Sequence, residues 1–152
     1  IKTLGFDIKD VKILLNSHAH FDHAGGLAKL KRDSGAKLIA SAADKPILER
    51  GRISFGPSAT DPFPPVKVDR AVKDGDTVDL GGVTLTAHVT PGHTPGCTDW
   101  TMPIVAGEPT SSRSRSVSAG SPGDSGRDVS KALSCATAAA VGATGRDWIV
   151  SR

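Results

Sequence analysis

The stretch Asn16-Ser-His-Ala-His-Phe-Asp-His-Ala-Gly-Gly26 places three histidines and one aspartate within six residues. It directly follows Val11–Leu15, a short apolar run of strand-forming residues that predicts a buried strand. Helical spacing begins at Leu27 and ends at Ser34-Gly35. The motif therefore lies between a strand and a helix, which is where α/β proteins commonly build their sites.

The spacing of these side chains suits metal ligation. In an extended segment, residues two apart point the same way, so His18 and His20 are expected to face one ion. Asp22 and His23 are adjacent where the chain turns and are expected to face a second ion. Imidazole and carboxylate groups are ligands that borderline metals such as zinc prefer.

A fourth histidine stands on a turn far along the chain. His93 lies in Pro91-Gly-His-Thr-Pro95, and we expect it to complete a three-histidine set with His18 and His20. Three neutral ligands leave one zinc position open for water, which is the catalytic arrangement. Zinc lowers the pKa of that water to about 7, so hydroxide is available at neutral pH.

Other polar residues near these motifs have simpler interpretations. His88 lies in a predicted strand and is interpreted as a packing residue. Asp44 and Asp61 are interpreted as a helix-start residue and a loop residue. Ser17 and Thr94 are expected to orient the ligands through hydrogen bonds, because they adjoin them in the sequence. Two aromatic residues could line a pocket or pack in the core: Phe55 and Phe63.

The rest of residues 1–109 alternates short strands and helices. Gly81-Gly82 joins two alternating segments, as a tight hairpin turn requires. Residues 52–65 contain four prolines and predict a long irregular loop. The remaining predicted elements are strands over Lys37–Ser41, Thr77–Leu80, Val83–Val89 and Cys97–Met102, and a helix over Ala43–Arg50.

Residues 110–152 differ from this body in composition. Ser, Ala, Gly and Arg make up 27 of these 43 residues, a mixture that buries little apolar surface. Its best element is a weak helix on the alanines of Ser130 to Val141. The net charge of +3 also belongs to this tail, because residues 1–109 carry thirteen charges of each sign. The tail lacks a dense basic run, so nucleic-acid binding is not expected.

Composition excludes some classes and leaves others open. No apolar run approaches the roughly 18 residues that span a bilayer, so we expect no membrane partner. The chain begins at Ile1 and shows no signal peptide, which suggests a mature chain or a piece of a longer one. Cys97 is interpreted as a small buried residue. Whether it pairs with Cys135 stays open, because the two could form a disulfide or be free thiols.

His18-Ala-His-Phe-Asp-His23 resembles the signature of the metallo-beta-lactamase superfamily of dinuclear hydrolases. Wider stretches resemble the third subclass of zinc beta-lactamases, and the resemblance runs from about Leu4 to Met102. These stretches are Asn16 to Gly26, Ala40-Ser-Ala-Ala-Asp44, Phe63-Pro-Pro-Val-Lys-Val-Asp69, and Thr90-Pro-Gly-His-Thr-Pro-Gly-Cys97 with Trp100.

The resemblance implies an α+β fold, a four-layer αββα sandwich of which only part is present here. It implies that the first zinc is bound by His18, His20 and His93. Asp22 and His23 would bind the second zinc, and Asp22 is also the candidate catalytic residue. The implied reaction is hydrolysis of a β-lactam amide by metal-bound hydroxide, in the periplasm.

Two departures from the family pattern accompany the resemblance. The family has further strands before the segment that corresponds to Ile1, and a later histidine that completes the second zinc site. No histidine follows His93 here, so the second site is expected to be incomplete. The change of composition near Thr110 suggests that residues 110–152 are an unmatched, disordered tail that arose by a frameshift, and a novel tail is the alternative.

The predicted function is that of a zinc-dependent β-lactam hydrolase with a small-molecule substrate. Two alternatives stay open. The first is another hydrolase of the same fold, such as a lactonase or a thioesterase. The second is that the 152-residue chain is a truncated, inactive fragment that at most binds metal, with poor solubility because half a sandwich exposes sheet edges.

Overall fold

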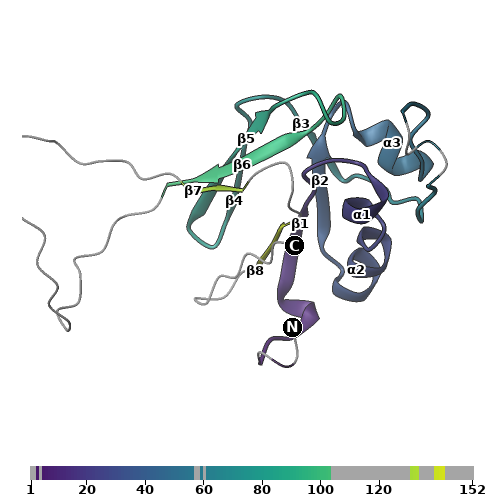
Figure 1. Ribbon diagram of the computed structural model, residues 1–152. Helices are drawn as coiled ribbons and strands as arrows, with labels where there is room; N and C mark the ends of the chain where they lie inside the picture. The colour runs from purple at the N-terminus through teal and green to yellow at the C-terminus, as the bar shows by residue number, and fades with distance from the viewer. Residues whose placement is uncertain are drawn as a thin grey trace, which may run out of the picture.

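The computed structural model describes residues 3, 5–56, 59, 61–103, 131–133 and 139–142. Two four-stranded sheets lie face to face, and helices cover the outer face of one of them (Figure 1). Sheet A has the strand order β3-β2-β1-β8, and sheet B the order β4-β5-β6-β7. The elements of the first half are η2 (Ile8–Asp10), β1 (Val11–Leu15), α1 (Phe21–Ala24), α2 (Leu27–Ser34), β2 (Lys37–Ser41) and α3 (Lys45–Arg50).

Sheet A is built from parallel crossovers. β1 pairs in parallel with β2, with Leu14 opposite Leu38, and the connection between them contains α2. β2 pairs in parallel with β3 (Arg70–Val72) through a connection that contains α3. Parallel strands are buried on both faces, which accounts for the three consecutive buried apolar residues that end β1, Ile13, Leu14 and Leu15.

Sheet B is an antiparallel meander of β4 (Thr77–Leu80), β5 (Val83–Val89) and β6 (Thr98–Met102). Gly81 and Gly82 both have positive φ angles, of 60° and 84°, as the tight turn between β4 and β5 requires. The inner side chains of β5, Leu85 and Ala87, are buried, whereas Thr84 and His88 on the other face are exposed. The alternation expected from the sequence is therefore present.

Two apolar clusters hold these layers together. The first lies between the helices and sheet A and includes Leu14, Leu38 and Leu48. The second lies between the two sheets and includes Leu15 and Trp100. Adjacent residues of β1 thus point into different clusters, because successive side chains of a strand face opposite ways.

The predicted elements agree closely with the structure in the body of the chain. The strands at 11–15, 37–41, 77–80 and 83–89 have the predicted bounds, and so does the helix ending at Ser34. The helix expected from Ala43 begins at Lys45, and the strand expected from Cys97 begins at Thr98. Three short elements were not predicted: η2, α1 and β3.

The weak helix predicted over Ser130 to Val141 is wrong where that range is described. Lys131–Leu133 is strand β7 and Ala139–Gly142 is strand β8. They pair antiparallel with β6 and β1 respectively, whose edges would otherwise present unpaired backbone groups. An isolated alanine-rich helix of this length is marginal without a packing partner. The proposed boundary between residues 109 and 110 lies outside the described residues.

Candidate metal centre

The loop that follows β1 is fixed to both sheets by its backbone. Asn16 donates its backbone N–H to the carbonyl of Ile39 on β2, at 3.2 Å. From the other sheet, Thr98 donates its N–H to Ser17 O at 2.8 Å, and Trp100 donates Nε1–H to Asn16 O at 3.2 Å. The start of the histidine motif therefore has a defined position between the two sheets.

The motif then changes from an extended conformation to a helical turn. His20 is extended, with φ −80° and ψ 156°, and stands at the N-cap of α1. Asp22 and His23 follow within that turn. The turn is tight, because a Cβ placed on Gly25 would lie 2.8 Å from the carbonyl oxygen of Phe21. The extended part therefore carries His18 and His20, and the helical turn carries Asp22 and His23.

His93 reaches the same place from the other sheet, in the loop between β5 and β6. The loop closes through a hydrogen bond from Thr90 N–H to Cys97 O at 2.7 Å. The ring centroid of His93 lies 4.6 Å from that of His18 and 4.4 Å from that of His20. Three imidazoles from two distant parts of the chain thus lie next to one another, with ring centroids no more than 5.0 Å apart.

The candidate ligand atoms form two groups whose members lie within 4.8 Å of one another. The first group is the predicted set of three histidines, His18, His20 and His93. The second contains the predicted pair Asp22 and His23 and also His18, whose ring centroid is 3.9 Å from that of His23. His18 is common to both groups, so Asp22 and His23 are the members that belong to the second group alone.

The residues of the first group fit a metal ion. Burial, and secondarily the neighbouring His93, lower the pKa of His20, which favours the neutral imidazole that a metal requires. Within the described residues, Nδ1 of His20 is buried and has no hydrogen-bond partner. A buried polar atom without a partner is costly, and a metal ion would satisfy it. The chemistry of the donor set, three imidazole nitrogens, suits zinc.

Each group has one exposed member, His93 in the first and Asp22 in the second. The side chain of Asp22 is 75% exposed, and its Oδ2 lies 3.3 Å from Nε2 of His23. Ser17 Oγ lies 3.4 Å from His18 Nδ1 and 3.3 Å from His23 Nδ1. The hydroxyl of Ser17 is therefore placed to orient two imidazoles, as expected from its position in the sequence.

Asp44 differs from its predicted role. It stands at the N-cap of α3, but its side chain makes no capping hydrogen bond. Instead its carboxylate is fully buried and accepts hydrogen bonds from Ala19 N–H and Thr94 Oγ1–H. Burial raises the pKa of Asp44, against the effect of these hydrogen bonds. Thr94 thus contacts this carboxylate, whereas the sequence predicted that it would contact a ligand.

The remaining predictions have mixed outcomes. His88 does not pack in the core: it is exposed on the outer face of sheet B, and its Nε2 lies 2.9 Å from Thr101 Oγ1. Phe63 is buried in the first cluster, whereas Phe55 is 43% exposed. Cys97 is buried as predicted. The question of its pairing involves Cys135, which lies outside the described residues.

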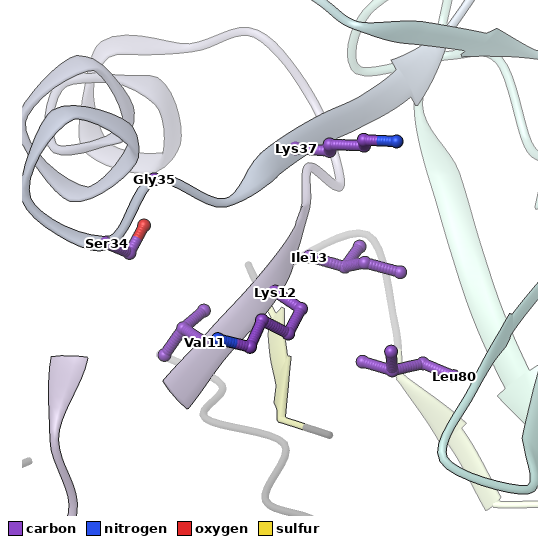
Figure 2. Close-up of a pocket in the computed structure, with 7 residues that line it drawn as sticks. All are labelled: Val11, Lys12, Ile13, Ser34, Gly35, Lys37 and Leu80. Atoms are coloured by element: carbon purple, nitrogen blue, oxygen red, sulfur yellow. The ribbon is translucent and has the colours of Figure 1, made fainter. Parts of the chain in front are cut away.

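A cavity of about 360 Å³ lies away from these side chains. It opens at the start of β1 (Figure 2), whereas the sequence places the histidine motif after the end of that strand. It contains none of the candidate ligands, so we do not assign the chemistry to it. Its lining residues are Val11, Lys12, Ile13, Ser34, Gly35, Lys37 and Leu80.

Comparison with known proteins decides the family. The model of the metallo-beta-lactamase superfamily matches residues 1–103. The chain belongs to the metallo-beta-lactamase superfamily. The resemblance inferred from the histidine motif is thereby confirmed, and with it the metallo-beta-lactamase fold, of which this chain covers a part.

Solved structures of this superfamily resemble the chain closely. BJP-1, a subclass B3 metallo-beta-lactamase of Bradyrhizobium japonicum, is 53% identical with a TM-score of 0.65, over 70% of this chain and 41% of that chain. A metallo-beta-lactamase of Cronobacter sakazakii is 48% identical with a TM-score of 0.65, over 68% of this chain and 40% of that chain.

A curated relative carries a different activity in its name. The hydroxyacylglutathione hydrolase of Hyphomonas neptunium is 42% identical over 81 residues, which are 53% of this chain and 25% of that protein. The chain thus spans about a quarter of this relative and about two fifths of the solved structures. Of the four layers expected, the described residues supply one helical layer and the two sheets. No described helix covers the outer face of sheet B or is long and apolar enough to cross a membrane.

Proposed function

We propose that this chain carries the metal-binding part of a zinc-dependent, periplasmic β-lactam hydrolase. The observation that carries the choice of substrate is the 53% identity with a subclass B3 metallo-beta-lactamase over 70% of the chain. The curated hydroxyacylglutathione hydrolase matches a smaller share of the chain at lower identity. The convergence of three imidazoles supports a hydrolase that uses a metal ion.

In this proposal His18, His20 and His93 hold the first zinc, and Asp22 and His23 contribute to the second. Zinc at such a site supplies Lewis-acid activation of water at neutral pH. His20 contributes a neutral imidazole, since its partial burial lowers its pKa. The hydroxyl of Ser17 orients the rings of His18 and His23.

Asp22 is the candidate catalytic residue because its carboxylate is exposed beside the partly buried His23 and the buried His18. There it can orient the attacking water and accept a hydrogen bond from it. In the overall reaction the water oxygen bonds to the lactam carbonyl carbon and the carbon–nitrogen bond breaks. The released nitrogen takes up a proton, so the products differ from the substrate by one water.

A second candidate is thioester hydrolysis, which the name of the Hyphomonas neptunium relative favours. A lactonase of the same fold is a third possibility without a specific observation in its support. The geometry of the imidazoles is compatible with all three, because each reaction adds water to a carbonyl carbon. The substrate must therefore be decided by measured rates.

The test is to load the 152-residue chain with zinc and compare three substrates: a carbapenem, an acyl-homoserine lactone and a glutathione thioester. We expect the carbapenem to be opened faster than the other two, but slowly, since the second site is expected to be incomplete. A chelator should stop this hydrolysis. His93→Ala is the matched control, since it removes one ligand of the first group and should abolish turnover.

Faster hydrolysis of the thioester or the lactone would replace the β-lactam proposal with that substrate. Zinc binding without turnover of any of the three would support the inactive, metal-binding fragment. Strong chelator-sensitive β-lactam turnover would contradict the expectation of weak activity, and with it the view that the second site limits this chain.

A further inference from the structure

The carboxylate of Asp44 connects two segments that carry candidate ligands. Its Oδ2 accepts hydrogen bonds from Ala19 N–H at 3.0 Å and from Thr94 Oγ1–H at 2.7 Å. Its Oδ1 accepts one from Gly96 N–H at 2.8 Å. All these bonds are buried, and they join positions 25, 50 and 52 residues apart in the sequence.

The donors lie directly beside the imidazoles. Ala19 separates His18 from His20, so its backbone N–H fixes the segment that presents both rings. Thr94 follows His93, and Gly96 lies three residues beyond it. One side chain therefore links the segment after β1 to the loop that joins β5 to β6.

The close approach of the second segment depends on the absence of a side chain at Gly96. A Cβ placed there would lie 2.0 Å from Ser41 Oγ and 2.6 Å from the backbone nitrogen of Asp44. Both distances are shorter than real Cβ contacts. Ser41 in turn accepts a hydrogen bond from Asp44 N–H at 3.2 Å, which holds the backbone of Asp44 in place.

A carboxylate suits this position better than its neutral analogue. Two oxygens that only accept hydrogen bonds meet three donors, whereas an amide would bring a donating NH₂ group against one of them. Burial of a charge is costly unless it is satisfied by such bonds. The absence of a capping bond to α3 shows that the side chain is oriented toward the two segments and not toward its own helix.

We propose that Asp44 is a positioning residue that preforms the three-histidine site by holding the His18–His20 segment and the His93 loop at a fixed separation. The inference rests on the proposed metal site. The hydrogen bonds that the Asp44 carboxylate accepts come from two backbone N–H groups and from the Thr94 hydroxyl, so it acts on the ligands through the backbone and Thr94. Its role is therefore to set ligand geometry before an ion arrives.

The test compares Asp44→Asn with Asp69→Asn in the full 152-residue chain. Asp69 is a matched control, because its carboxylate also accepts a backbone N–H, that of Leu38, but contacts neither ligand segment. Zinc affinity is measured by competition with a chelator, and cobalt is used as a spectroscopic probe of ligand geometry. The free energy of unfolding of both metal-free variants is measured alongside.

We expect Asp44→Asn to weaken zinc binding by about tenfold or more and to change the visible spectrum of bound cobalt, as loss of a supporting partner does in metal sites. Asp69→Asn should lose stability but keep the zinc affinity and the cobalt spectrum. Equal zinc affinity and identical cobalt spectra in wild type and Asp44→Asn would overturn the proposal. A merely structural role would lower stability in both variants and leave the spectrum unchanged.

Thr94→Val keeps the inference testable if Asp44→Asn does not fold. It removes one of the three donors and should weaken zinc binding by about fivefold, the value of one hydrogen bond. Unchanged affinity and spectrum in that variant would count against the proposal.

A metal-free measurement separates this inference from the proposed function. Hydrogen exchange at Ala19 and Gly96 should be slow in the metal-free wild type and faster in Thr94→Val. If that holds but the wild type binds no zinc or cobalt, the metal site fails while the connection through Asp44 stands. If zinc binds but the two amides exchange rapidly in the wild type, the positioning role fails while the metal site stands.

Discussion

The two apolar clusters differ in the parts of the chain that they join. The cluster between the helices and sheet A contains residues from β1 to Val68, so its members lie within one continuous half of the body. The cluster between the sheets joins β1 and β2 to β4, β5 and β6, which come much later in the sequence. The first cluster therefore holds together the first half of the body, and the second holds that half against the half that contains β4, β5 and β6.

This difference matters for the metal centre because the candidate ligands are divided in the same way. Four of them, from His18 to His23, belong to the half that contains the first cluster. His93 belongs to the other half and reaches the rest only when the sheets are docked. Stability of the first cluster and geometry of the metal centre should therefore be separable by mutation.

The largest expected effect is that of Trp100→Ala. Trp100 is 1% exposed in the cluster between the sheets, and it donates Nε1–H to Asn16 O beside the histidine motif. Removing this side chain should cost about 3–5 kcal/mol of the free energy of unfolding. It should also weaken zinc binding, measured by chelator competition, because it separates the ligand-bearing halves. Full zinc affinity in a folded Trp100→Ala protein would refute the idea that the metal centre depends on packing between the two halves.

Leu48→Ala is the corresponding change in the first cluster. Leu48 is fully buried on α3, and its truncation should cost about 2–5 kcal/mol in a urea titration. Because the cluster does not join the two halves, zinc affinity of the folded protein should stay within about twofold of wild type. A large loss of affinity here would show that the two clusters cannot be treated separately.

Zinc itself should stabilise the docking of the sheets. A ligand that binds only the folded state adds about 2.7 kcal/mol at one hundred times its Kd. Since His93 and the other ligands come from different halves, the gain should appear as slower hydrogen exchange in β5 and β6. His93→Ala should reduce this protection from exchange, and a chelator should remove it. Protection confined to the helices would contradict this expectation.

The smallest effect is expected at Asp69, which connects parts of the first half alone. Burial opposes its ionised form, but hydrogen bonds from Lys31 and from Leu38 N–H outweigh this and hold the pKa of Asp69 below its ordinary value. Asp69→Asn should cost about 1 kcal/mol at pH 7. The difference from wild type should persist above about pH 4, the ordinary pKa, and vanish as pH falls through the lowered value.

Unfolding of both proteins between pH 2 and pH 7 tests this sign. A difference that grows as the pH falls would mean that the pKa of Asp69 is raised in the folded state. Zinc affinity at pH 7 should be equal in wild type and Asp69→Asn. Equal affinity would show that the loss of stability is confined to the first half of the body.

The sequence was most informative where one local rule decides the conformation. The alternation of β5 and the glycine pair before it fix both strands of the hairpin, so their predicted bounds agree with the structure. The three residues of β3 carry no such pattern, since they are a strand only because β2 lies beside them. The strands β7 and β8 were missed for the same reason.

The candidate metal centre shows the same limit. Five candidate ligands could be named because histidine and aspartate carry their chemistry wherever the chain places them. Ser17, which adjoins a ligand, could be named as a positioning residue, but Asp44 and Trp100 could not, because they act on partners 25 and 84 residues away. The sequence correctly predicted that a helix starts near Asp44. It did not indicate that the Asp44 carboxylate points away from that helix. The stretch from Ala40 to Asp44 resembled the family, and this was the available signal.

The packing around Gly96 bears on how related sequences will be interpreted. The space for a methyl group at this position is already filled by Ser41 and by the backbone of Asp44. Substitutions there will be removed by selection as efficiently as substitutions of a ligand, although glycine has no group that takes part in catalysis. In an alignment of homologues, position 96 should therefore be as invariant as the histidines for steric reasons alone. A method that ranks residues by invariance would therefore assign Gly96 a catalytic role, although the constraint on this position is steric.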